Sequence, residues 1–124
     1  MNKIEKDIQV SNINSEIFPL YRVTLKKSDK FFGPGVSQLL HHIDDLKSIQ
    51  SACKKMGMSY SKAWNIIKFA EKELGYKLLD TKSGGQGGGV SILTNECKNF
   101  LDKYDKMMNE LNVYTKEVYL KYFS

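Results

Sequence analysis

Gly57 lies in a turn of three residues that separates two segments of helical periodicity. Before this turn, apolar residues recur at i, i+3, i+4 and i+7, at Ile49, Ala52, Cys53 and Met56. Ser48 is placed to cap this helix at its N-terminus, and Ser59 is placed to cap the next one. Glycine readily adopts the left-handed conformation that ends a helix. Two short helices joined by a tight turn form the helix-turn-helix pattern.

The second helix of the pair is expected over residues 60–74, with Gly75 at its end. Its apolar residues predict a buried face at Ala63, Ile67, Ala70 and Leu74. Polar residues at i, i+4, i+7 and i+11 form a separate outer stripe: Ser61, Asn65, Lys68 and Lys72. Trp64 is next to the buried face. Because large aromatic side chains are usually mostly buried, we favour partial burial of Trp64 over a contact with a base or sugar.

Short elements precede and follow this pair of helices. Residues 21–26 alternate apolar and polar side chains, which predicts a half-exposed strand. Pro34 fits the first turn of a helix. The apolar positions of that helix follow at helical spacing: Val36, Leu39, Leu40, Ile43 and Leu46. Residues 76–82 and 90–93 predict two strands on either side of a glycine cluster at 84–89, and such a hairpin is a wing.

Thr94 is placed to cap a last, long helix that reaches towards Phe123. Its large apolar residues recur at steps of 4, 3, 4, 3 and 4, which is a heptad seam. The seam consists of Phe100, Tyr104, Met107, Leu111, Tyr114 and Val118. A helix of this length is roughly 45 Å long, too long to be covered by so small a domain. We therefore expect a partner helix, most simply from a second copy of the chain, to cover the seam in a homodimer.

The expected fold class is mainly α with a small β wing: a winged helix-turn-helix with a long C-terminal dimerisation helix. A chain of 124 residues suits one domain with appendages. Residues 1–17 have no clear hydrophobic period, and we expect them to be partly disordered. Residues 18–93 would form the winged helix-turn-helix domain, and residues 94–124 the dimerisation helix.

Positive charge is concentrated on the helix pair and the start of the wing. Residues 47–82 contain eight lysines and three acids, a net +5 that equals the net charge of the whole chain. A localised positive field favours a polyanion as partner, most simply double-stranded DNA. An ordinary solvated lysine face is the plainer alternative. The turn, the segregated charge and the wing together favour DNA.

The expected DNA contacts lie on the second helix of the pair and on the wing. Early residues of a recognition helix reach phosphates and base edges in the major groove, where Asn can bond bidentately to adenine. The expected contacts on the helix are Ser59, Tyr60, Ser61, Lys62, Asn65 and Lys68. On the wing, whose glycines allow close approach to a phosphate, they are Lys82, Ser83 and Gln86. A merely flexible glycine hairpin is the alternative to a DNA-binding wing. A nucleotide-binding loop is disfavoured because the glycine cluster lacks the Gly-Lys-Ser/Thr signature.

Other classes of function have little support. No stretch approaches the ~20 apolar residues of a membrane span, and the polar start of the chain is not a secretory signal. Cys53 and Cys97 are expected to be reduced, buried thiols of a cytoplasmic protein. His41 and His42 lie close to acidic residues in the sequence, which is compatible with a metal site. No other cysteine or histidine has ligand spacing, so we do not expect one. Without a nucleophile–base pair we expect no enzyme and no cofactor.

Several strings of residues carry a resemblance to a known family. They are KSIQSA at 47–52, GMSYSKAW at 57–64, ELG at 73–75, and GGQGGG at 84–89 followed by LT at 93–94. Over residues 21–111 the chain resembles the N-terminal DNA-binding domain of the ModE family of molybdenum-dependent regulators. That domain is related to the winged helix of LysR-type regulators.

The resemblance implies a dimeric winged-helix regulator that binds a palindromic operator, with DNA contacts at the helix and wing residues named above. Two positions depart from the family pattern: Gln86 stands where the family is often basic, and Cys97 replaces a common glycine. ModE regulators carry C-terminal molybdate-binding domains; we expect no such domain in residues 1–124 and carry over no molybdate sensing. We expect a transcriptional regulator. The alternative is a winged-helix adaptor that binds a partner protein through its long helix.

Overall fold

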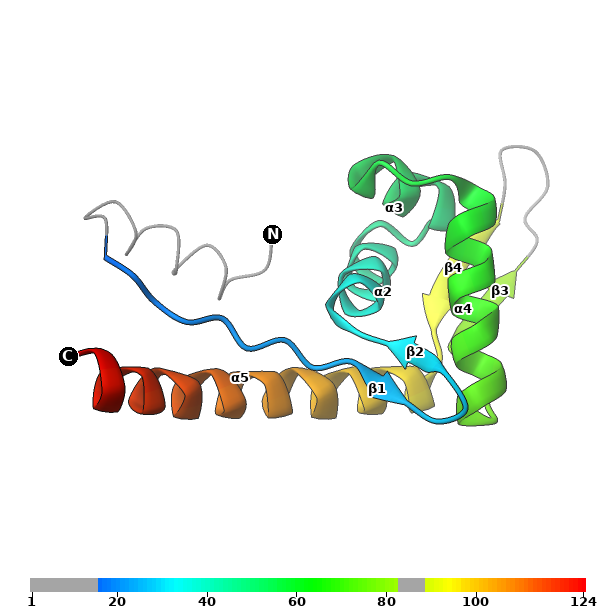
Figure 1. Cartoon of the computed structure of the whole chain (residues 1–124). Helices are drawn as coiled ribbons and strands as arrows, with labels where there is room; N and C mark the ends of the chain where they lie inside the picture. Colours follow the sequence, from blue (N-terminus) through cyan, green and yellow to red (C-terminus); the bar gives the residue numbers. More distant parts are fainter. Residues whose placement is uncertain (1–15, 83–88) are drawn as a thin grey trace. The chain divides into compact units, whose positions relative to one another are not determined.

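The computed structural model describes residues 16–82 and 89–124. The elements are, in order, β1 (Leu25–Lys26), β2 (Lys30–Phe32), α2 (Pro34–Leu46), α3 (Ile49–Met56), α4 (Tyr60–Leu74), β3 (Leu79–Lys82), β4 (Val90–Leu93) and α5 (Asn95–Phe123) (Figure 1). The expected class, a winged helix with a long C-terminal helix, is confirmed. The chain divides into two compact units, Thr24–Asp102 and the combination of Met1–Val23 with Lys103–Ser124. The domain boundaries expected after residues 17 and 93 stay a prediction.

The helix-turn-helix of the first unit begins and ends where local chemistry dictates. Ser48 and Ser59 each accept a hydrogen bond from the backbone N–H three residues later, at 3.1 Å in both cases. These bonds satisfy amide groups that a helix N-terminus leaves without partners. Gly57 and Gly75 end α3 and α4 with φ angles of 67° and 82°, in the left-handed region that favours glycine. The predicted caps and the predicted turn are confirmed.

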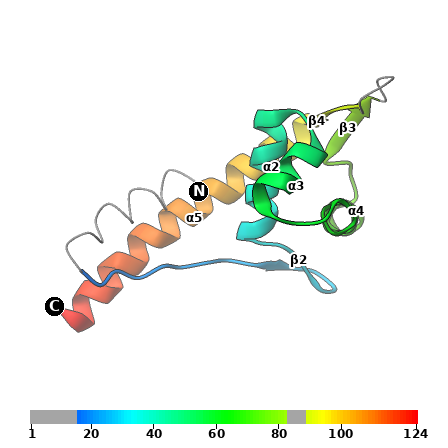
Figure 2. The same ribbon diagram turned by 90° about the horizontal axis from the view of Figure 1, so that it is seen from above.

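The core of this unit is centred on α2, which contacts α3, α4, β2 and β4. In Figure 2, which looks almost along α4, the strands β3 and β4 lie beside that helix. The largest fully buried side chains come from β2, α2, α4, the residue before β3 and the start of α5: Phe32, Leu39, Leu40, Ile43, Ile67, Leu78 and Cys97. Fully burying a side chain such as Leu contributes roughly 1.5–3 kcal/mol. Burial of this set therefore fixes α4 against the rest of the unit.

One apolar position of α2 is exposed, and one position of the buried face predicted for α4 is wrong. Leu46 is 41% exposed because it is the last residue of α2, after which Lys47 takes a left-handed conformation. On α4, Glu73 is buried and Leu74 is only half-buried. The β1–β2 turn supplies the polar partners, because the Ser28 hydroxyl donates a hydrogen bond to the Glu73 carboxylate. A buried carboxylate is tolerated where such a donor meets it.

The strand predicted over residues 21–26 and the first strand of the wing are both shorter than predicted. Of residues 21–26, only Leu25–Lys26 forms a strand, which pairs with β2. The first wing strand begins at Leu79 rather than at residue 76. It pairs antiparallel with β4 from Leu79 opposite Leu93 to Lys82 opposite Val90. The predicted wing hairpin is thus confirmed in its paired residues.

In the second unit, side chains of α5 bind the backbone that precedes β1. The Asn112 amide accepts a hydrogen bond from Tyr21 N at 2.8 Å and donates one to Tyr21 O at 3.1 Å. The Tyr104 hydroxyl donates to Val23 O at 2.7 Å. These bonds give residues 21 and 23 side-chain partners, which is why no strand forms there. Among the described residues, no helix is long and apolar enough to span a membrane.

Candidate nucleic-acid interface

The structure places the predicted recognition-helix residues together on the exposed side of α4. All six are exposed: Ser59, Tyr60, Ser61, Lys62, Asn65 and Lys68. Ala63, Ile67 and Ala70 lie on the opposite side, and each is 0% exposed. A helix with one face in the core can present only its other face to a ligand. The polar stripe is therefore the surface that α4 offers to a partner.

The N-terminus of α4 is suited to an anion. Unpaired N–H groups and the helix dipole make the first turn of a helix electropositive. The Ser59 side-chain oxygen already accepts a hydrogen bond from Lys62 N, so its hydroxyl proton is what it can give to a phosphate. Lys62 adds a charged side chain to the same turn. A hydroxyl, a lysine and backbone N–H donors thus all belong to the first turn of α4 and its cap.

Trp64 is half-buried, which confirms the partial burial predicted for it. Its ring lies nearly parallel to that of Tyr60, at an interplanar angle of 10° and a centroid distance of 6.4 Å. The Lys68 ammonium lies 4.5 Å from the centroid of the Trp64 ring. A cation over an indole face is an attractive arrangement. Tyr60, Trp64 and Lys68 therefore form one stack along consecutive turns of α4.

Glu71 is a member of this surface that the sequence interpretation missed. Its Oε1 lies 3.0 Å from Lys68 Nζ, and its Oε2 accepts a hydrogen bond from Leu78 N at 2.8 Å. The carboxylate thus joins α4 to the chain just before β3. The i, i+3 spacing of Lys68 and Glu71 was a readable signal for the ion pair. The hydrogen bond to Leu78 had no such signal.

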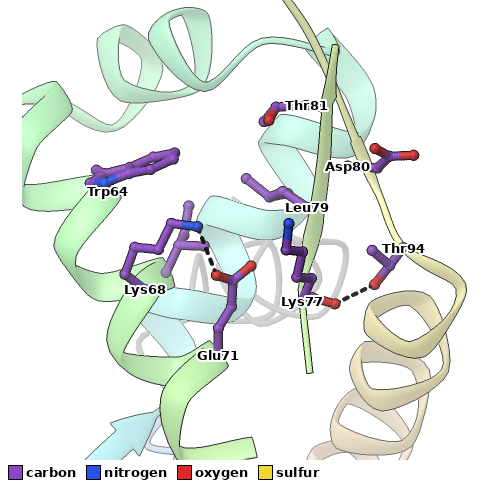
Figure 3. A pocket seen from close by; sticks show the side chains of 9 residues that line it. Trp64, Lys68, Glu71, Lys77, Leu79, Asp80, Thr81 and Thr94 are labelled. Atoms are coloured by element: carbon purple, nitrogen blue, oxygen red, sulfur yellow. Dashed lines mark hydrogen bonds and ion pairs between the residues drawn. The ribbon is translucent and has the colours of Figure 1, made fainter. Parts of the chain in front are cut away.

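A cavity of about 140 Å³ lies between α4 and β3 (Figure 3). It is lined by Trp64, Ile67, Lys68, Glu71, Lys77, Leu79, Asp80, Thr81 and Thr94. Thr94 Oγ1 donates a hydrogen bond to Lys77 O at 2.7 Å and accepts one from Cys97 N at 3.1 Å. Thr94 therefore caps α5, as predicted, and also ties that cap to the start of the wing.

The wing residues are described only in part. Lys82 is the last residue of β3 and pairs with Val90. Ser83 and Gln86, predicted to contact DNA, lie outside the described residues. The contribution of the wing loop therefore stays a prediction.

The predicted dimerisation seam on α5 is covered at its start by the chain itself. Phe100 packs edge-on against Phe32, with ring centroids 4.8 Å apart, and Tyr104 is only 4% exposed. Further along, Tyr114 is 61% exposed and Val118 is 37% exposed. A shallow groove on this part of the helix is lined by Lys103, Lys106, Met107, Glu110, Leu111 and Tyr114. The surface left for a partner helix is thus the seam from Met107 onwards.

The cysteines and histidines of the described part offer no second site. Cys53 and Cys97 are free and buried, as predicted. Burial, with the nearby charges of Asp44 and Glu71, raises the pKa of Cys97 to about 12. Within residues 16–82 and 89–124, no three His, Cys, Asp or Glu side chains are placed to hold a metal ion.

Comparison with known proteins relates this chain to a group of regulators, although no family model matches the sequence. The chain is 34% identical over 84 residues to the "DNA-binding transcriptional dual regulator ModE" of Escherichia coli K12, a match that covers 67% of this chain and 32% of that protein. It is 33% identical over 75 residues to "Transcriptional regulator ModE" of Haemophilus influenzae, covering 60% and 29% of the two chains. The match therefore spans about a third of the length of these relatives. Over the matched residues, this chain is a homologue of the ModE transcriptional regulators.

Proposed function

We propose that this chain is a sequence-specific DNA-binding transcriptional regulator. The observation that carries the proposal is the exposed polar stripe of α4 within a capped helix-turn-helix. Homology to proteins named as DNA-binding and transcriptional regulators supports it. The buried free thiols of Cys53 and Cys97 fit a reducing compartment, and we propose the cytoplasm.

In the proposed complex, α4 enters the major groove with its N-terminal turns. The Asn65 amide would bond bidentately to adenine, while Ser61 and Lys62 would meet neighbouring base edges. Ser59 and Tyr60 would contact the phosphates beside them, and Lys68 would neutralise a further phosphate. On the wing, Lys82, Ser83 and Gln86 would contact the flanking backbone.

We further propose that two copies pair through α5 and bind a palindromic site. The residues left to make the contact are Met107, Leu111, Tyr114 and Val118. Two recognition helices in successive major grooves lie about 34 Å apart. Phe100 and Tyr104, the first two seam positions, would act indirectly, by fixing the helix from which this surface projects.

Selection of bound duplexes from a random pool tests the proposal most directly. We expect an inverted repeat with half-sites about one helical turn apart. A salt titration of the selected duplex should show a steep slope. With roughly 6–10 phosphate contacts, affinity falls about a thousandfold or more between 50 and 200 mM salt. Failure to enrich any sequence, together with a shallow slope, would contradict DNA recognition.

The exposed apolar side chains of α5 favour a second candidate, an adaptor that binds another protein. Besides the seam, the exposed residues include Val113, Leu120, Tyr122 and Phe123. Sedimentation of the purified chain separates the two possibilities. A stable monomer would contradict the homodimer and favour a different partner protein.

A further inference from the structure

A continuous series of contacts runs along α4 to the base of the wing. It begins with the stacked rings of Tyr60 and Trp64, continues through the Lys68 ammonium above the indole, and passes to the Glu71 carboxylate. It ends at the Leu78 amide, which donates to Glu71. The series places an acid in contact with a lysine that the recognition surface presents to solvent. Figure 3 shows Trp64, Lys68 and Glu71 together at one wall of the cavity.

The two partners of this ion pair differ in exposure. The Lys68 side chain is 45% exposed, whereas the Glu71 side chain is 11% exposed and is also held by the Leu78 amide. Glu71 is therefore the fixed partner, and Lys68 is the one that can move. Because the carboxylate is 3.0 Å from the ammonium, it offsets the charge that Lys68 would otherwise present to a polyanion.

We propose that Glu71 is a positioning residue for Lys68. In the free protein it holds the ammonium over Trp64, and on binding DNA a backbone phosphate takes the place of the carboxylate as the partner of Lys68. This inference rests on the proposed role of α4 as the recognition helix. Its consequence is that Glu71 lowers the affinity for any duplex, because each complex must give up the Lys68–Glu71 contact. The chain thus carries a built-in restraint on its affinity for duplex DNA of any sequence.

The positioning can be tested without DNA, by nuclear magnetic resonance of the free protein. Protons over an indole face are shifted upfield by the ring current, so the ε-methylene protons of Lys68 should resonate upfield of those of the other lysines. Glu71→Gln keeps an oxygen that can accept from Leu78 N but removes the charge. In this variant we expect the upfield displacement of the Lys68 ε-methylene protons, relative to the other lysines, to fall by half or more. An ordinary Lys68 shift in the wild type, or an unchanged one in Glu71→Gln, would overturn the inference.

The second test measures DNA affinity and its salt dependence. Exposed ion pairs are worth little, so Glu71→Gln should bind a random duplex about two- to fivefold more tightly at low salt. The salt slope should change little in Glu71→Gln, because Lys68 acts on a phosphate in both proteins, whereas Lys68→Ala should make the slope shallower by about one. In a Lys68→Ala background, the same Glu71→Gln change should give no gain. A gain that persists there would show that Glu71 does not act through Lys68.

Glu16→Gln is the matched control, because it makes the same change in net charge at an exposed position outside α4 and outside the α5 seam. The control should leave the affinity for DNA within about 1.5-fold of the wild type. If it gained as much affinity as Glu71→Gln, the gain would be an effect of net charge and not of Lys68. The thermal midpoints of all variants check that the fold is intact. If the wild-type chain binds no duplex, the proposed function is contradicted. The positioning of Lys68 by Glu71 is tested separately, by the chemical shift of Lys68 in the free protein.

Discussion

The side chains of α4 perform two separate tasks. Ala63, Ile67 and Ala70 hold the helix on the core, where each is fully buried. Asn65 and Lys68 face solvent and take no part in that packing. Exposed side chains of this kind can usually be replaced at a stability cost within about 0.5 kcal/mol. Changes at Asn65 and Lys68 should therefore report on recognition rather than on folding.

Asn65→Ala and Lys68→Ala should have different effects on DNA binding. Loss of the Asn65 amide should relax discrimination at one base position, by about 1–3 kcal/mol against the selected base. Loss of the Lys68 ammonium should weaken binding to all sequences alike. Competition assays with single-base variants of the selected site measure both effects. Unchanged affinity and specificity in both variants would refute the assignment of α4 as the recognition helix.

Ser59 has a structural role that can be separated from its proposed contact with DNA. Ser59→Ala removes the acceptor for Lys62 N and should lower the free energy of unfolding by about 1 kcal/mol. Ser59→Asp keeps a good cap but sets a negative charge where a phosphate is expected. It should retain stability and weaken DNA binding at least tenfold. Denaturant titration and affinity measurement on the same samples make the comparison, and wild-type affinity in Ser59→Asp would contradict the phosphate contact.

The elements differ in how completely the chain covers them. α2 is surrounded by four other elements, whereas α5 continues past its covered start into a stretch with exposed apolar side chains. Large exposed apolar patches commonly mark an interaction surface. The seam and the outer positions of α5 expose similar side chains, so exposure alone does not say which face pairs. The heptad spacing makes that distinction.

Tyr114→Gln and Val113→Gln form a matched pair that tests the seam. The two side chains are 61% and 63% exposed, and only Tyr114 lies on the predicted seam. Burying an aromatic side chain in an interface is worth roughly 1.5–3 kcal/mol, so Tyr114→Gln should raise the dimer dissociation constant tenfold or more. Val113→Gln should change it less than about twofold. Analytical ultracentrifugation measures both, and equal effects would contradict pairing through the seam.

For the molecule as a whole, the two buried thiols report on the opening of the winged-helix unit. Both cysteines belong to Thr24–Asp102, and burial raises the pKa of each. Because the thiolate is the nucleophile, burial and a raised pKa both slow reaction with a disulfide reagent.

Neither Cys53 nor Cys97 should react appreciably with such a reagent at pH 8 while the unit is folded. Both should react within minutes in denaturant, where burial and the pKa shift are lost. Absorbance of the released thiol measures the number that react. Cys53→Ala leaves Cys97 as a single reporter, and rapid reaction of that variant under native conditions would contradict the buried position of Cys97.

Much of the fold and part of the candidate site follow from the sequence alone. The caps at Ser48, Ser59 and Thr94, and the glycines that end α3 and α4, were predicted and are confirmed. The exposed stripe of α4 and the pairing of the wing strands were also predicted and are confirmed. These features depend on residues close together in sequence, whose spacing decides which hydrogen bonds and faces form.

Only the tertiary structure decided which distant groups meet. Glu73 is buried because the β1–β2 turn brings Ser28 to it, and Asn112 binds the backbone of Tyr21 from 91 residues away. The Glu71 carboxylate likewise accepts a hydrogen bond from the Leu78 amide, beyond the end of its own helix. Hydrophobic periodicity marks a face as buried or exposed, but it does not identify the group that will lie opposite. That choice depends on how the elements pack in space, and it determines the hydrogen-bond partners of the two acids, Glu73 and Glu71.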